Sequence, residues 1–170
     1  MSNDGDSPNY ALVPADFPSA HILSSLSGAT DKLLVREFEG RYYQPGASPP
    51  ERYARWRQCT ELANFFAIKC RENENGKYVH LSRPQILDQY FVRLIAEGYG
   101  TTREMAWVIR ETASKLEWPV PEIASETIIA KVPHCDLVGD KTAIAEVVRY
   151  LEALSSVQGI ATHNVRPRDT

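Results

Sequence analysis

Apolar side chains recur every three or four residues along most of residues 48–158, which is the spacing of an amphipathic helix. The longest stripe lies in residues 48–72 and is widened by Tyr53, Leu62 and Phe65. Its central members are Trp56, Cys59, Ala63, Phe66 and Cys70. Ser48 precedes two prolines, and this sequence supplies an N-cap and a first helical turn. The pattern therefore predicts one long helix over residues 48–72.

Two further stripes follow in close succession. Ser82 begins the first with a proline in its first turn, and Gly98 ends it as a C′ residue. The second opens with Thr101 and Glu104 at capping-box spacing and runs to about residue 117. Because only a few residues separate the two helices, the chain must turn back on itself, and we predict a helical hairpin over residues 82–117.

The remaining segments complete an all-α prediction. A last helix is expected from Asp140 to about residue 158, and a short extended piece is expected over residues 77–81. Residues 31–43 fit either a helix or a short β-hairpin, since Gly40 weakens a helix by about 1 kcal/mol. Residues 122–132 are ambiguous. The sequence thus predicts a single compact domain of five to six helices with at most a minor β element.

Both ends differ in composition from this body. Residues 1–20 contain three aspartates and three prolines but no lysine or arginine, which predicts a flexible acidic N-terminal arm. Residues 160–170 are polar and contain a proline, and we predict a flexible C-terminal tail. The folded helical domain is expected to span residues 22–158.

Charge and cysteine usage narrow the function classes. The chain has 19 basic and 22 acidic side chains, a net charge of −3, and a pI near 5.8, so it has no general positive field for nucleic acid or membrane lipid. It lacks a run of about 18 apolar residues and a secretory signal pattern, and we expect a cytoplasmic protein. Its three cysteines fit neither a disulfide framework nor a zinc motif, so we expect no metal and no cofactor.

Arginine and aromatic residues are interleaved at the start of the longest predicted helix. Cations there oppose the helix dipole by about 0.3 to 1 kcal/mol each and favour a compensating anion. Tyrosine, tryptophan and arginine also dominate protein-binding hot spots. Tyr99 lies in the turn of the predicted hairpin, and Trp107 lies off the apolar stripe. The predicted partner-binding residues are Arg52, Tyr53, Arg55, Trp56, Arg57, Tyr99 and Trp107.

Two alternative functions follow from other segments. Residues 101–115 could belong to a helix-turn-helix DNA reader that acts as a dimer, although residues 110–112 contain no glycine or helix break. His134 and Cys135 adjoin in one loop and would be the starting point for a cysteine-dependent enzyme. Residues 139–142 resemble a phosphate-binding loop only superficially, because the first glycine of that motif is missing.

These observations favour a non-enzymatic helical domain that binds another protein, as an adaptor, inhibitor or immunity-type factor, through its arginine and aromatic surface. No residue is assigned a catalytic role. DNA binding is the first alternative and the cysteine-dependent enzyme is the second. A homodimer is compatible with each of these functions.

Overall fold

The computed structural model describes residues 8–19, 35–132 and 141–157. Its main elements are five α-helices and one small two-stranded sheet. The helices are α1 (Pro49–Glu74), α2 (Arg83–Ala96), α3 (Thr102–Leu116), α4 (Glu126–Ile129) and α5 (Lys141–Val157). The strands are β1 (Arg36–Phe38) and β2 (Arg41–Tyr43). The all-α prediction with a minor β element is therefore confirmed.

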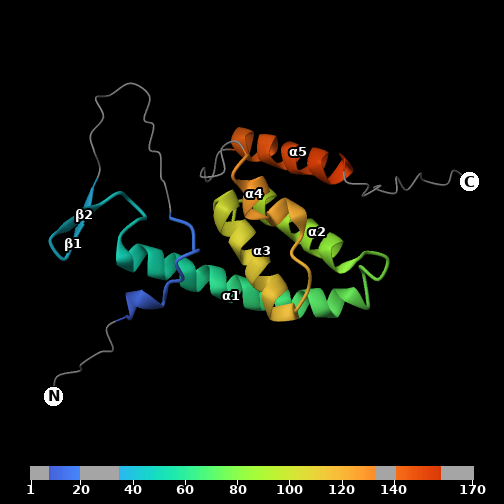
Figure 1. The fold of residues 1–170 in the computed structure, drawn as a ribbon, viewed down its shortest axis with the longest axis horizontal. Helices are drawn as coiled ribbons and strands as arrows, with labels where there is room; N and C mark the ends of the chain where they lie inside the picture. The colour runs from blue at the N-terminus through green and yellow to red at the C-terminus, as the bar shows by residue number, and fades with distance from the viewer. Residues whose placement is uncertain (1–7, 20–34, 133–140, 158–170) are drawn as a thin grey trace, which may run out of the picture.

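The helices form a layered body in which α2 and α3 lie between α1 and α5 (Figure 1). Helix α3 packs against both α1 and α2, and α5 packs against α2. Helices α2 and α3 form the predicted hairpin, with Gly98 at φ +72° in the turn between them. The fully buried side chains of Phe91, Leu94 and Ile109 lie in the single core that these helices share.

Local capping explains where the two principal helices begin. At α1, the Glu51 carboxylate accepts hydrogen bonds from the backbone N–H and the hydroxyl of Ser48. At α3, the Thr101 hydroxyl accepts from the backbone N–H of Glu104, and the Glu104 carboxylate accepts from the backbone N–H of Thr101. These reciprocal bonds satisfy donors that have no partner within a helix.

The ambiguous segment around Gly40 is a β-hairpin in its described part. Glu37 pairs with Tyr42 in an antiparallel register. The two turn residues, Glu39 and Gly40, have φ values of +49° and +72°. Positive φ at both central positions matches the right-handed twist of the flanking strands, which explains why a hairpin forms here rather than a helix.

Two other expectations about local structure are revised. Residues 77–81, expected to be extended, form consecutive turns. The ambiguous residues 122–132 contain a 3-10 helix, Glu122–Ala124, followed directly by α4. Each X-Pro step near residue 120 disfavours a continuous helix, so only short helical pieces follow α3.

The described part of the predicted N-terminal arm lies against the helical body. Residues 8–19 contain a 3-10 helix, Tyr10–Leu12, that contacts α1 (Figure 1). Phe17 is only 3% exposed and belongs to the core. This segment therefore makes specific contacts, which its acidic and proline-rich composition does not predict.

Candidate protein-binding surface

The structure divides the predicted partner-binding residues among different environments. Arg55 and Tyr99 line one groove. Arg52, Tyr53 and Trp107 contact the chain's own N-terminal segment. The other two do not line the groove themselves: Trp56 is half-buried against the core beside Tyr53, and Arg57 is exposed and pairs with Glu61, which lines the groove. The expected single surface is therefore two separate regions.

Arg55 is held in place by a carboxylate from another helix. Its Nε and Nη2 atoms donate to the two carboxylate oxygens of Glu104 at 2.9 and 2.7 Å, and its Nη1 donates to Gln58. Glu104 is also the residue that caps α3. The hydrogen bonding that Arg55 donates to Glu104 is the main cause that raises the pKa of Arg55. The compensating anion expected for this arginine is thus a residue of the chain itself.

Gly100 explains how the α2–α3 turn approaches this ion pair so closely. A Cβ atom at this position would lie 2.7 Å from Arg55 Nη2 and 2.7 Å from Glu104 Oε2. Any larger side chain would have to displace both charged groups. Glycine at this position lets the turn, with Tyr99 beside it, pack against α1.

A groove of about 400 Å³ lies between α1 and this turn. Its walls carry two large aromatic side chains, Phe65 and Tyr99, which are 51% and 53% exposed. The other lining residues are Arg55, Gln58, Cys59, Glu61, Leu62 and Met105. Ile68, one turn after Phe65 on α1, is 59% exposed and extends the apolar surface along the helix. The groove combines apolar walls with a fixed guanidinium group.

Cys59 lines this groove and is buried. Burial raises the pKa of its thiol to about 12. At neutral pH such a thiol carries almost no thiolate, which is the nucleophilic form. The groove therefore provides contact area and hydrogen bonding but no activated nucleophile at Cys59.

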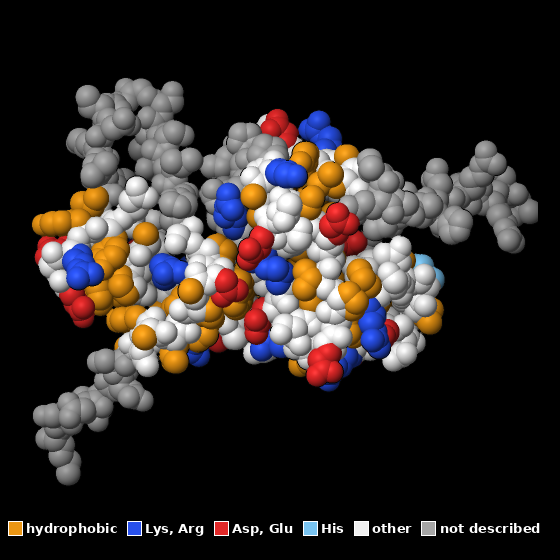
Figure 2. Space-filling view, in the orientation of Figure 1, with side chains coloured by type: hydrophobic (Ala, Val, Ile, Leu, Met, Phe, Trp, Pro, Cys, Tyr) orange, Lys and Arg blue, Asp and Glu red, His pale blue; other side chains and the backbone are white. Residues whose placement is uncertain are grey.

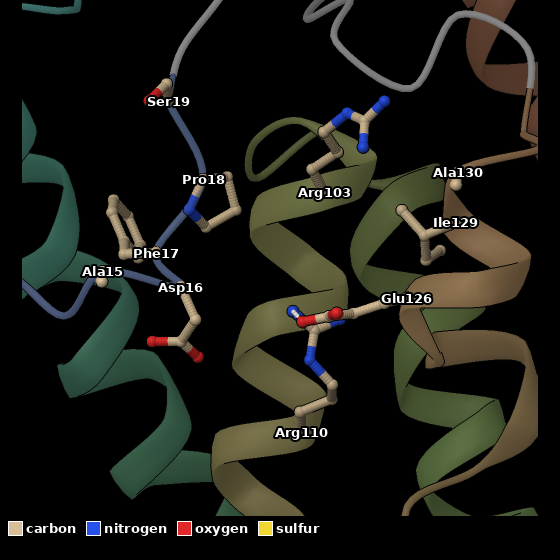
Figure 3. A pocket seen from close by; sticks show the side chains of 10 residues that line it. All are labelled: Ala15, Asp16, Phe17, Pro18, Ser19, Arg103, Arg110, Glu126, Ile129 and Ala130. Atoms are coloured by element: carbon tan, nitrogen blue, oxygen red, sulfur yellow. Dashed lines mark ion pairs between the residues drawn. The ribbon is translucent and has the colours of Figure 1, made fainter.

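A second cavity, of about 560 Å³, opens between the N-terminal segment and α4 (Figure 3). Arg103 and Arg110 of α3 line it, and Asp16 and Glu126 lie on its two sides. Arg110 donates to the carbonyl of Ala124 at 3.0 Å and lies 3.9 Å from Glu126. Burial is the main cause that lowers the pKa of Arg110.

Trp107 is not a free surface residue. It is 4% exposed, its indole N–H donates to Asp16 at 3.2 Å, and its ring contacts Phe17 edge to face. The position of Trp107 off the main apolar stripe led to its assignment as a partner contact. Residues 16 and 17, distant in sequence, cover it instead.

Phe65 and Glu104 are the important residues that the sequence analysis did not assign to the surface. Sequence spacing puts Phe65 beside the core stripe: it follows Cys59 by six positions, a rotation of about 600°, equivalent to 240°, which places it at the flank of that stripe. Glu104 was assigned only as a cap, and its contact with Arg55, 49 residues away, has no local sequence signal.

The segments on which the two alternative functions depend give little support for DNA binding or for cysteine catalysis. Helix α3 is continuous from Thr102 to Leu116, without the break that a helix-turn-helix reading around residue 110 requires. Acidic and basic side chains are interspersed over the face in Figure 2. His134 and Cys135 lie outside the described residues, as do Gly139 and Asp140 of the superficial phosphate-loop match.

Two searches of the structure were also negative within the ranges it describes. Over residues 8–19, 35–132 and 141–157, no group of three or more histidine, cysteine, aspartate or glutamate side chains is placed to hold a metal ion. Across these same ranges, no helix has the length and apolar character needed to cross a membrane.

Comparison of the chain with protein-family models, curated proteins and solved structures finds no match. The function must therefore be argued from the groove and its surroundings.

Proposed function

We propose that this chain is a non-enzymatic helical domain that binds a partner protein in the groove between α1 and the α2–α3 turn. The main supporting observation is that Phe65 of α1 and Tyr99 of the α2–α3 turn, each about half exposed, line the same groove. Two large aromatic side chains around a concave apolar surface are typical of a binding hot spot.

The lining determines the chemistry of the expected partner. Leu62, Phe65 and Met105 favour a large aliphatic or aromatic side chain inserted between the walls. Because Arg55 is already paired with Glu104, it can donate a hydrogen bond to a partner group that carries no negative charge. We therefore expect an apolar anchor residue on a partner segment whose remaining side chains are polar.

The geometry also favours binding over catalysis at this groove. Arg55 is immobilised by two hydrogen bonds, and the Cys59 thiol has its pKa raised to about 12. A preorganised wall loses little conformational entropy on binding, which favours affinity. This supports an adaptor, inhibitor or immunity-type role.

The test uses a photo-crosslinking amino acid in place of Gln58 in the full chain, within cells that express the protein. The crosslinked partner is then purified, and its affinity is measured against groove variants. Phe65→Ala and Tyr99→Ala should each weaken binding by at least about tenfold, since each removes a hot-spot side chain.

The matched controls are Tyr42→Ala and Val79→Ala, which remove exposed apolar side chains, 70% and 71% exposed, outside the groove lining. These variants should bind the partner as the unchanged chain does. Equal affinities for Phe65→Ala and Val79→Ala would contradict the proposal, provided that circular dichroism shows both variants folded.

A further inference from the structure

The N-terminal segment occupies the second region of predicted partner-binding residues in the manner of a bound peptide. Asp16 accepts from the Trp107 indole N–H at 3.2 Å, and the Phe17 ring meets the Trp107 ring at 5.1 Å with an interplanar angle of 88°. Phe17 is almost fully buried as a result. A carboxylate and the aromatic side chain that follows it are thus both recognised by one tryptophan.

Arg52 recognises the backbone of the same segment. Its Nη2 atom donates to the carbonyl of Phe17 at 2.9 Å, while its buried Nε atom has no hydrogen-bond partner within the described parts of the chain. A backbone contact is independent of the side chain at that position, so it is available to any extended segment of similar shape. One buried donor of this arginine remains for another acceptor.

A second anchor lies seven residues earlier. The Tyr10 ring contacts Tyr53 at 5.8 Å and Phe38 of β1 at 5.6 Å, in both cases edge to face. These anchors hold the segment along α1 at one end and against α3 at the other. Separate pockets for separate side chains are a common feature of peptide recognition.

The segment leaves space at its carboxyl end. Pro18 and Ser19 form one wall of the 560 Å³ cavity, and Arg103 and Arg110 extend from α3 toward it (Figure 3). The Arg110 side chain is 20% exposed, and it lies 3.9 Å from the carboxylate of the largely exposed Glu126. An acidic side chain in place of Ser19 would bring negative charge to this partly desolvated guanidinium group.

We propose that this face of α1 and α3 binds an extended segment of a partner protein that carries a carboxylate, an aromatic residue and then a further acidic residue. Residues 16–18 occupy the site within the chain until that partner displaces them. The site is distinct from the groove lined by Phe65 and Tyr99, and it does not depend on the function proposed for that groove.

A partner of this composition has an advantage over a second copy of the chain. A covalently attached segment competes at an effective concentration of order mM, so an identical segment from another molecule rarely displaces it. An additional contact from an acidic residue to the partly desolvated Arg110 would supply the affinity that an identical copy lacks.

The test compares the full unchanged chain with an opened variant, Asp16→Asn combined with Phe17→Ala. The probe is a fluorescein-labelled synthetic peptide of residues 8–19, and binding is measured by fluorescence anisotropy. The opened variant should bind the probe at least about tenfold more tightly than the unchanged chain, because its own segment no longer competes. A probe with Ser19→Glu should bind still more tightly, and that gain should disappear near 0.5 M salt.

A probe with Phe17→Ala serves as the ligand control and should not bind. Val79→Ala, a change at an exposed site, serves as the protein control and should behave as the unchanged chain. If the opened variant is not folded by circular dichroism, Asp16→Asn alone takes its place.

Two results would overturn the proposal. The first is absence of probe binding to a folded opened variant at concentrations up to about 1 mM, the range in which the attached segment competes. The second is a doubling of molecular mass of the unchanged chain on concentration, measured by light scattering and lost in Phe17→Ala. That result would assign the site to a second copy of this chain rather than to a different protein.

Discussion

Asp88 on α2 is a buried carboxyl group without evident compensation. It is 9% exposed, and its Oδ1 atom has no hydrogen-bond partner among the described residues. Desolvation by burial raises its pKa from 3.8 to about 6. The folded state therefore binds its proton more tightly than the unfolded state does. As pH rises from below 4 to above 6, this group lowers the free energy of unfolding.

Replacing Asp88 with asparagine should remove this penalty. At pH 7.5, Asp88→Asn should increase the free energy of unfolding by about 1 to 3 kcal/mol, since one pKa unit corresponds to 1.36 kcal/mol. The gain should shrink toward zero near pH 4, where the folded carboxyl is neutral. Urea denaturation at both pH values provides the measurement, with Glu37→Gln on the exposed hairpin as control. An equal gain at both pH values would contradict the argument.

The Arg55 and Glu104 pair joins α1 to α3 through a carboxylate that is only 5% exposed. Arg55→Ala would leave that carboxylate buried without its main partner, and we expect a loss of about 2 to 3 kcal/mol in the free energy of unfolding. The arginine side chain is 34% exposed, which places the loss at the lower end of values for buried pairs.

A double-mutant cycle with Glu104→Gln isolates the interaction between the two side chains. The coupling free energy should be about 1 to 3 kcal/mol. The Arg83 and Glu74 pair, with side chains 54% and 28% exposed, provides the matched comparison and should couple by about 0.5 kcal/mol. Both coupling free energies are measured by urea denaturation. Similar values for the two pairs would show that burial of Glu104 does little to strengthen its interaction with Arg55.

At the scale of elements, the most extensive contact between described helices is that of α1 with α3. Ala63 of α1 is fully buried, and its carbonyl oxygen accepts from the Thr112 hydroxyl of α3 at 3.4 Å. Ala63→Leu must push the helices apart or force a strained rotamer, so we expect a loss of about 1 to 3 kcal/mol in the free energy of unfolding. Ala54→Leu, on the exposed side of the same helix, is the control. Thermal denaturation of both variants distinguishes overpacking from a general effect of leucine.

Helices were predictable from sequence where the signals are local. The Ser48 and Glu51 bonds and the Thr101 and Glu104 bonds each span three residues, and the sequence shows both pairs directly. The segment around Gly40 is ambiguous in sequence because Leu34, Phe38 and Tyr42 recur at helical spacing, while strict alternation also partly fits. Local spacing alone could not choose between helix and hairpin there.

At the scale of the whole molecule, the surface was less predictable than the helices. Trp107 looked free because helix periodicity describes only the contacts of its own stripe, whereas Asp16 reaches it from 91 residues away. Arg55 and Tyr99, far apart in sequence, line one groove, and their role in binding a partner stays a prediction.

The buried thiols of Cys59 and Cys70 can report how often the folded core opens to solvent. Burial raises the pKa of Cys59 and of Cys70 to about 12, compared with an ordinary value of 9.0. At pH 8 this difference lowers the thiolate fraction by about a thousandfold, because each pKa unit changes that fraction about tenfold. Alkylation of both residues should therefore require opening of the contact between α1 and the core.

The experiment follows N-ethylmaleimide labelling of Cys59 and Cys70 by peptide mass spectrometry. If labelling follows the population of opened molecules, any substitution that stabilises the fold should lower both labelling rates together. Asp88→Asn at pH 7.5 provides such a stabilised variant. A Val79→Cys variant, at a site 71% exposed, should label rapidly in the folded state. If Cys59 alone labels rapidly, the groove opens independently of the core. The wall that carries Phe65 would then be mobile, and a partner would have to order it on binding, with a corresponding loss of affinity.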